Sequence, residues 1–262
     1  MSLSATNIND LGMRLYEAWK NASQIPPITE SFSNASIEDA YQIQLAMIDQ
    51  RIKSGETVVG KKIGITAKIV MDMLGVDQPD FGHLTSGMEF KNSDDLPTKK
   101  FCQPKGEGEI AFLLNKDLIG PGITYAQVVA ATECVVPAFE IVDSRIKDWK
   151  IKIQDTIADN ASAGAFILGS PQKRIIGIDL ATCGMVLKKN GEIIGTGAGA
   201  ATLDHPVNAV VWLANMLGSL GMNLRAGEVI LSGSLSIMFP IQSGDKLEME
   251  IGGIGRAACQ FD

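Results

Sequence analysis

Two short apolar runs of this sequence carry acidic side chains at positions that a folded chain has to bury. Residues 104–112 read PKGEGEIAF, with Glu107 and Glu109 two positions apart. Residues 134–143 read CVVPAFEIVD, with Glu140 near the centre. Runs of this length and composition are typical of largely buried strands. An ionised carboxylate inside such a strand is costly unless it is paired or binds a metal, so the fold has to supply a partner.

Strand geometry places these acids on a common face. Alternate residues of a strand share a face, so Glu107 and Glu109 point the same way, and the glycines beside them leave room for another segment on the opposite face. If the two runs are neighbouring strands, Glu140 joins them, and neither strand interior contains a basic residue. Three converging carboxylates call for a divalent cation. Because all the ligands are oxygens, Mg²⁺ or Mn²⁺ fits better than zinc.

Two simpler interpretations of the acids stay open at this point. Glu107 and Glu109 are also compatible with solvated acids at an exposed strand start. Glu140 is also compatible with an ion pair to an arginine or lysine from elsewhere in the fold.

Length and charge limit the class of protein. A chain of 262 residues can bury one sizeable core, or a main domain with a small appendage. A net charge of −7 and a pI near 5.0 argue against nucleic acid or an anionic membrane as a partner. The first residues lack the apolar core of a signal peptide, and no apolar stretch is long enough to span a bilayer. We therefore expect a cytosolic protein.

Cysteine and histidine usage excludes several kinds of site. The cysteines are scattered without a Cys-x-x-Cys pair, which favours reduced, mostly buried thiols over a disulfide framework or a zinc site. Only His83 and His205 are available, too few for a histidine-based metal site and little to work with for a Ser-His-Asp triad. His205 precedes Pro206, which is expected to open a helix, so His205 is interpreted as a capping or loop residue. The cysteines are Cys102, Cys134, Cys183 and Cys259.

The pattern along the chain predicts an α+β fold. Residues 1–75 are expected to form a helical N-terminal region, with one helix starting at Ser36 and stopping at Gly55. Residues 76–262 are expected to form the catalytic domain, rich in short strands, with two helices that do not alternate regularly with them. This order favours a rolled or barrel-like mixed sheet over a Rossmann fold.

Lysines and aspartates near the expected strands add candidate chemistry. Lys61 and Lys62 lie in a strand-like run, so one is expected to face outward and the other inward, where it could bind an acidic substrate or transfer protons. The alternative is that both lysines are solvated. Asp77 and Asp80 flank Pro79 in an expected turn or loop. Turn chemistry explains Asp77, whereas Asp80, beside an apolar residue, is the better candidate for a catalytic acid or base.

Two further segments are candidates for ligand contacts. A stretch dense in polar residues follows Glu140 and runs to Ser162, and it is expected to form a loop around the metal pocket, or else a solvated loop with local capping bonds. The segment LSGSL, residues 231–235, exposes backbone amides and hydroxyls after a strand and is suited to holding a carboxylate.

Taken in order, these stretches resemble a known enzyme family. GKKIGIT, GVDQPDFG, PKGEGEIAF, the long run from VVPAFEIVD to DNAS, and EVILSGSL resemble the bacterial 2-hydroxypenta-2,4-dienoate hydratases of aromatic meta-cleavage pathways, over nearly the whole chain. These enzymes belong to the fumarylacetoacetate-hydrolase-like superfamily, with the 4-oxalocrotonate decarboxylases as near relatives. The resemblance implies a mixed β-roll behind a small helical N-terminal region and a pentamer-based homo-oligomer. It also implies possible association with a pathway decarboxylase or aldolase.

The resemblance also assigns roles to individual residues. It implies that Mg²⁺ or Mn²⁺ is held by Glu107, Glu109 and Glu140, and that Lys62 is the active-site lysine. It implies substrate contacts from Ser162 and from the residues Ser232, Gly233 and Ser234.

The implied reaction is the hydration of 2-hydroxypenta-2,4-dienoate to 4-hydroxy-2-oxopentanoate. Its alternatives are 4-oxalocrotonate decarboxylase and a non-catalytic subunit that binds keto acids. Asp80 favours the hydratase, because water addition benefits from a base, whereas a carboxylate there would repel the second acid group of the decarboxylase substrate.

Overall fold

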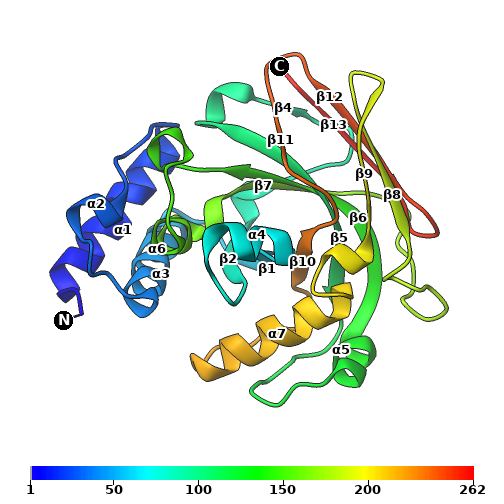
Figure 1. The fold of residues 1–262 in the computed structure, drawn as a ribbon, viewed down its shortest axis with the longest axis horizontal. Coiled ribbons are helices and arrows are strands. Elements are labelled where there is room, and N and C mark those ends of the chain that lie inside the picture. Colours follow the sequence, from blue (N-terminus) through cyan, green and yellow to red (C-terminus); the bar gives the residue numbers. More distant parts are fainter. Residues whose placement is uncertain (1) are drawn as a thin grey trace.

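Three N-terminal helices lie at one end of the molecule, in a computed structural model that describes residues 2–262 (Figure 1). They are α1 (Ala5–Lys20), α2 (Ile28–Ser31) and α3 (Ile37–Lys53). The predicted start of α3 is confirmed, because Ser36 and Asp39 form a reciprocal capping box there. Helices α1 and α3 pack against each other, and α3 also contacts the short helix α6 (Ile153–Ala158).

The larger sheet forms the centre of the molecule. Over residues 2–262 it has eight strands in the order β2-β1-β10-β5-β6-β7-β3, with β11 paired to β5. Strands β1 and β10 pair in parallel, whereas β5 pairs antiparallel with both β10 and β6. The strands are β1 (Val58–Gly64), β2 (Asp80–Thr85), β3 (Glu89–Phe90), β5 (Pro104–Leu114), β6 (Thr132–Asp143), β7 (Ala163–Leu168), β10 (Val229–Ser234) and β11 (Phe239–Pro240).

The second sheet lies at the opposite end from the N-terminal helices (Figure 1). Within the described residues it has five strands in the order β4-β13-β12-β8-β9. Strands β8 and β9 form a hairpin whose turn contains Asn190 and Gly191, both with positive φ. The strands are β4 (Asp95–Leu96), β8 (Gly184–Lys189), β9 (Glu192–Ala198), β12 (Lys246–Ile251) and β13 (Gly255–Phe261).

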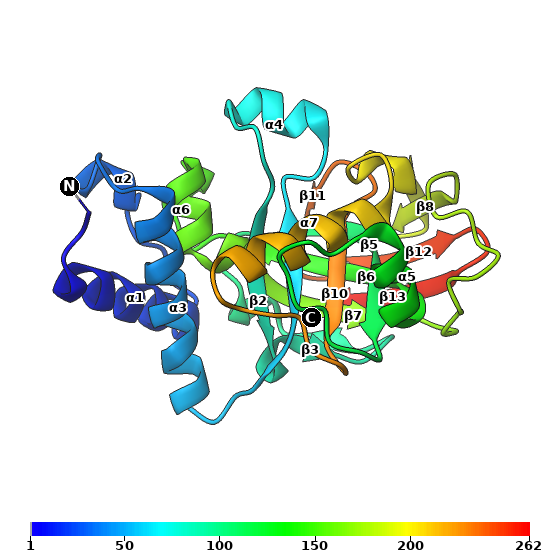
Figure 2. The same ribbon diagram turned by 90° about the horizontal axis from the view of Figure 1, so that it is seen from below.

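Three further helices connect the strands. Helix α5 (Tyr125–Ala131) begins after a capping box of Thr124 and Gln127. Helix α7 (Pro206–Ser219) begins at Pro206, and the ring of His205 caps it by accepting a bond from the Val207 amide, so the structural interpretation of His205 is confirmed. Helix α4 (Lys68–Leu74) follows β1 and stands apart from the sheets and the other helices (Figure 2).

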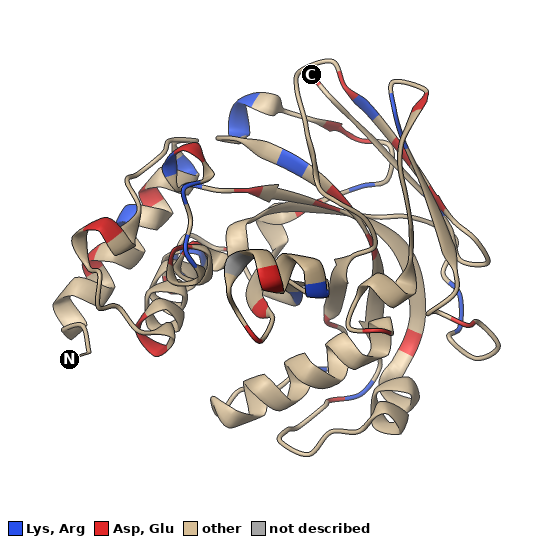
Figure 3. Cartoon of the chain, viewed as in Figure 1, with Lys and Arg blue, Asp and Glu red and all other residues tan. Residues whose placement is uncertain are grey.

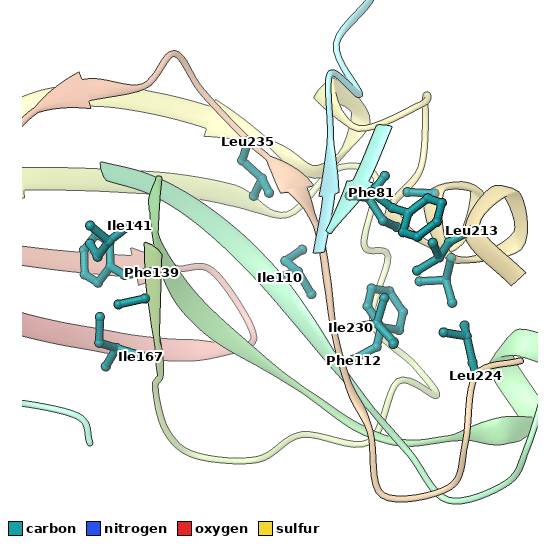
Figure 4. Packing of buried hydrophobic residues seen from close by; sticks show 14 of the residues in the cluster. Phe81, Ile110, Phe112, Phe139, Ile141, Ile167, Leu213, Leu224, Ile230 and Leu235 are labelled. Atoms are coloured by element: carbon teal, nitrogen blue, oxygen red, sulfur yellow. The ribbon is translucent and has the colours of Figure 1, made fainter. Parts of the chain in front are cut away.

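Apolar side chains from both the sheets and the helices form the main core. Figure 4 shows Phe112 and Ile230, from paired strands, gathered with Leu213 and Leu224, while Phe139 and Ile167 pack together further along the sheet. Short 3₁₀ turns complete the chain at Ser86–Met88, Thr98–Lys100, Lys147–Trp149, Asn160–Ser162 and Gly199–Ala201. The predicted α+β class with a mixed, curled sheet is confirmed.

Charged residues of both signs are spread over the fold. Acidic and basic positions are interspersed along the elements in Figure 3. Among residues 2–262, no helix is long and apolar enough to cross a membrane. The predicted boundary at residue 75 stays a prediction; strand β1, on its N-terminal side, is hydrogen-bonded into the larger sheet.

Candidate active site

Three glutamates meet on one face of the larger sheet. Strands β5 and β6 pair antiparallel, and the register places Glu107 directly opposite Glu140. Glu109 lies two residues further along β5 on the same face, and one carboxylate oxygen from each residue lies within 4.8 Å of the others. On the opposite face, the absence of a side chain at Gly108 leaves room for the sulfur atoms of Met185 and Met249. The period of the strand thus aims the acids together while its glycines admit the second sheet.

Several carboxylate oxygens of this cluster lack a hydrogen-bond partner. Oε2 of Glu140 and Oε1 of Glu109 are buried without a hydrogen bond from any described residue, and Oε1 of Glu140 has only an ion-pair contact with Lys62. Burial and the charge of Glu140 raise the pKa of Glu107 to about 7 and the pKa of Glu109 well above its usual range. Unpartnered, like-charged oxygens at this spacing fit a hard divalent cation, whose charge would hold all three carboxylates ionised.

A lysine from the neighbouring part of the sheet also reaches the cluster. Nζ of Lys62 lies 3.1 Å from Oε1 of Glu140 and donates a 3.0 Å hydrogen bond to the carbonyl oxygen of Ala161. The sequence left an ion pair and a carboxylate cluster as alternatives for Glu140. The structure contains both, because Glu140 has a basic partner and two acidic neighbours. Burial alone lowers the pKa of Lys62, but the surrounding carboxylates outweigh it and raise that pKa, so the ammonium stays charged.

Lys61 corrects an expectation about this strand. One of the two lysines was expected to face outward, and this is wrong, because both are buried. Lys61 lies on the opposite face of β1 from Lys62, where its Nζ is 2.9 Å from Oε1 of Glu228. Both faces of this central strand are covered, so alternation along the strand separates two buried environments instead of a buried face from a solvated one.

Replacing Lys61 is expected to affect stability more than chemistry. In Lys61→Met the Glu228 carboxylate stays largely buried without its partner, so we expect the free energy of unfolding to fall by about 3 kcal/mol. Urea denaturation monitored by circular dichroism measures this loss. The double variant Lys61→Met/Glu228→Gln should recover part of it, because the uncompensated charge is gone; no recovery would contradict the assignment of the ion pair.

Asp80 lies in a strand and faces the same region as Lys62. It is the first residue of β2 instead of part of the predicted loop, and it is 1% exposed. Its Oδ2 accepts a 3.4 Å bond from Oγ1 of Thr156, while Oδ1 has no partner among the described residues. A side chain at Gly64 would overlap Oδ1 of Asp80 and approach Nζ of Lys62 to 3.3 Å. The glycine therefore leaves a small space that both functional groups border.

A left-handed turn at residues 160–162 supplies the carbonyl oxygen that accepts the hydrogen bond from Lys62. Asn160, Ala161 and Ser162 all have φ values between +49° and +56°, a region that side chains rarely adopt. Asn160 holds the turn against β2, because its side chain accepts a bond from the His83 amide (2.7 Å) and donates one to the His83 carbonyl (2.9 Å). The turn presents the Ala161 carbonyl to Lys62. The sequence assigned no role to Asn160; its tolerance of left-handed geometry was the available signal.

The predicted substrate contacts differ in what their side chains do. Oγ of Ser162 is buried without a hydrogen-bond partner among the described residues, so it is available to a ligand. The Gly233 amide donates to Oε2 of Glu109 (2.7 Å), and Oγ of Ser232 donates to the Ile110 carbonyl (2.8 Å). Ser234 lines a cavity beside the cluster. The segment thus orients Glu109 through a backbone amide and exposes one serine.

Several acids after Glu140 support the fold instead of the cluster. Asp159 forms a fully buried ion pair with Arg145 (2.6 Å), and Asp155 accepts bonds from the amide and the hydroxyl of Thr29. Asp143 accepts bonds from two backbone amides at the start of β5. The expected loop contains helix α6 and two 3₁₀ turns, and these acids are buried in structural bonds, several of them to distant segments. It is therefore neither a continuous loop around the metal pocket nor a solvated loop.

A cavity of about 450 Å³ opens beside the glutamates. Glu107 lines it together with Gly64, Ser234 and Ser236, and the remaining wall is mostly apolar. Gly64 also adjoins Asp80 and Lys62, so the cavity lies next to both candidate catalytic groups.

Known proteins are similar to this chain over nearly its whole length. The profile of the fumarylacetoacetate (FAA) hydrolase C-terminal family matches residues 81–262. A 2-hydroxyhexa-2,4-dienoate hydratase from Comamonas testosteroni is 52% identical over 97% of each chain. A 2-hydroxypent-2,4-dienoate hydratase from Pseudomonas putida is 55% identical over 84% of this chain and 100% of its own.

A solved structure is similar over the full length. The 4-oxalocrotonate decarboxylase from Pseudomonas putida G7, complexed with magnesium and adipate, superposes with a TM-score of 0.97. The two sequences are 32% identical, and the match covers 99% of each chain. The similarity includes the N-terminal helices as well as both sheets.

Proposed function

From the premise that the chain belongs to the fumarylacetoacetate hydrolase family, and within it to the dienoate hydratases, we propose its function. The protein is a hydro-lyase that adds water to 2-hydroxypenta-2,4-dienoate and forms 4-hydroxy-2-oxopentanoate. The observation that carries this assignment is the buried cluster of three glutamates, with Lys62 beside Glu140 and Asp80 close by, next to a cavity that Glu107 lines. Relatives with more than half of their residues identical are hydratases of such dienoates.

The cofactor we propose is Mg²⁺ or Mn²⁺, held by Glu107, Glu109 and Glu140. The support is the set of unpartnered oxygens and the all-oxygen character of the ligands. The related decarboxylase, which is complexed with magnesium, is consistent with this choice. When bound, the cation supplies Lewis acidity at the carboxylate and the 2-oxygen of the substrate.

Side chains of the protein are placed to transfer the protons of the reaction. The 2-hydroxyl of the dienoate loses its proton while C5 gains one, which gives the 2-oxo-3-enoate. Water then adds across C3 and C4, with the hydroxyl group at C4 and the proton at C3. The Lys62 ammonium, held by the Ala161 carbonyl and Glu140, is placed to give and recover a proton beside the cavity. Oδ1 of Asp80, which has no other partner, is placed to orient a water molecule and accept its proton. Ser162 offers its unpartnered hydroxyl to the bound acid, whereas the hydroxyl of Ser234 donates to the Ser236 carbonyl (2.7 Å).

The main competing function is decarboxylation of 4-oxalocrotonate. It is favoured by the TM-score of 0.97 to a decarboxylase, whose sequence is nevertheless less similar than those of the hydratases. The cavity argues against it, because the only charged residue among its described lining residues is the acidic Glu107. A substrate with a second carboxylate would find no basic partner there. A non-catalytic keto-acid-binding role is disfavoured by the complete set of candidate catalytic groups.

Asp80 provides the test of the hydratase assignment. With Mg²⁺ or Mn²⁺, the wild-type protein should convert the dienoate to 4-hydroxy-2-oxopentanoate. Chromatography of the product measures this conversion. Asp80→Asn keeps the shape of the side chain but removes the base, so kcat should fall by at least about 10²-fold. Its Mn²⁺ affinity, measured by calorimetry, should stay unchanged. Rapid CO₂ release from 4-oxalocrotonate without hydration of the dienoate would overturn the assignment.

The proposed assembly rests on the resemblance, and the proposed location rests on the sequence. We propose a pentamer-based homo-oligomer in the cytosol, with possible association with a pathway decarboxylase or aldolase. Sedimentation equilibrium of the full chain tests the assembly size.

A further inference from the structure

The cavity beside the glutamates has one apolar wall made by two distant segments. Helix α4 and the residues before it form one part, and the segment between β10 and β11 forms the other. Figure 2 shows α4 standing apart from the rest of the fold; its Met71 is buried, whereas Ile69 and Met73 are exposed. The apolar residues of the wall are Ile63, Ile65, Ala67, Ile69, Val70, Met73, Ala201, Ile237 and Met238.

Four large side chains of this wall are unusually exposed. Ile69 is 77% exposed, Met73 75%, Ile237 81% and Met238 43%. Large apolar side chains gathered at one opening mark a surface that binds an apolar group. Their exposure also means that folding gains little from them, so packing of the core does not explain why they are apolar.

The position of the wall assigns it to one end of the substrate. Under the proposed function, the carboxylate and the 2-oxygen of the dienoate lie at the glutamates, and Glu107 lines the cavity from that side. Gly64, also in the lining, adjoins Asp80 and Lys62, which act at C4 and C5. The chain beyond C5 therefore points toward the apolar wall.

The cavity is larger than the smallest substrate needs. Its volume of about 450 Å³ lies in the range of pockets that hold drug-sized ligands, roughly 300–1,000 Å³. A five-carbon acid fills only part of it. The remaining space adjoins Ile69, Met73 and Ile237 and has no basic side chain among its described lining residues.

We propose that this wall is a subsite for an uncharged, apolar substituent at C5. The enzyme accepts 2-hydroxy-2,4-dienoates whose C5 alkyl chain is longer than methyl and rejects those with a C5 carboxylate. This inference rests on the proposed function and adds the class of substrate tail that the site selects. Ile69 and Ile237 are its main specificity-determining residues, because they come from the two different segments and are the most exposed of the wall.

The first test is a substrate series with unsubstituted, 5-methyl, 5-propyl and 5-carboxy dienoates. We expect kcat/KM to rise by about threefold for each added methylene, close to the transfer of a buried methylene from water. The 5-carboxy compound should fall at least about 100-fold below the 5-propyl compound, because its charge meets an apolar wall. A flat or falling alkyl series, or efficient turnover of the 5-carboxy compound, would overturn the subsite.

A binding measurement separates the subsite from turnover. Calorimetric titration with 2-oxopentanoate, 2-oxohexanoate and 2-oxooctanoate, in the presence of Mn²⁺, should show an affinity that increases with chain length. In Ile69→Gln/Ile237→Gln this dependence on chain length should be lost. Ile176→Gln is the matched control, because Ile176 is 82% exposed but does not line the cavity, and it should keep the wild-type dependence.

The two proposals fail in different ways. If no dienoate is hydrated, the proposed function is wrong, and the titrations still decide whether the wall binds apolar chains. If the unsubstituted dienoate is hydrated but affinity does not change with chain length, the subsite is wrong and the hydratase assignment stands.

Discussion

Glu140→Gln is expected to lose divalent-cation binding and to lower kcat/KM by about 10³-fold, the scale of several kcal/mol of lost Lewis-acid stabilisation. Glu140 is the residue that touches both parts of the site, because it faces Glu107 across the strand pair and lies 3.1 Å from Lys62. Calorimetric titration with Mn²⁺ measures the binding, and the thermal unfolding midpoint verifies that the variant is folded. Wild-type Mn²⁺ affinity in this variant, and in Glu107→Gln and Glu109→Gln, would refute the ligand assignment.

Removing one acid should also stabilise the protein when chelator is present. Burial and Glu140 raise the pKa of Glu107 to about 7, so the folded state binds a proton more tightly than the unfolded state. The stability that protonated Glu107 contributes is therefore fully present below about pH 4.5 and is lost as the pH rises to about 7. With chelator, Glu107→Gln should be more stable than the wild type at pH 8, and the difference should vanish toward pH 4. Urea denaturation at both pH values measures it.

Lys62→Met is expected to lower kcat by at least about 10²-fold, the usual scale for a proton-transfer group. Lys61→Met is a closely matched control. Both lysines are buried on the same strand with a carboxylate about 3 Å away, but they occupy opposite faces. Per folded molecule, Lys61→Met should keep most of its activity despite its lower stability. Equal and mild losses of kcat at both positions would remove Lys62 from the mechanism.

The local sequence pattern was sufficient to predict the position of a functional group where that group follows the two-residue period of its own strand. Glu107 and Glu109 are two apart on β5, so their common face needed no knowledge of the fold. The joining of Glu140 required one assumption, that the two apolar runs are neighbours, and the β5–β6 register satisfies it. The caps at Ser36 and Thr124 were also predictable, since a capping box involves only residues three apart.

Local pattern was insufficient where the environment of a side chain comes from distant segments. Lys61 was expected to alternate into solvent, but Glu228, 167 residues away, meets it in the interior. Asp80 was expected in a loop, yet pairing with β1 extends β2 to this residue. The role of Asn160 depends on bonds to the backbone of His83, which no spacing in the sequence indicates.

The sequence by itself determined the chemistry available to this protein, because residue identity and strand period decide which acids can share a face. It also determined the α+β class and, through the resemblance, the family. Tertiary structure alone decided how the groups are combined: Lys62 against Glu140, the Ala161 carbonyl behind Lys62, and the apolar wall beside the glutamates. These contacts join segments that are distant in the chain, and their geometry follows from sheet register and backbone turns instead of from local propensity.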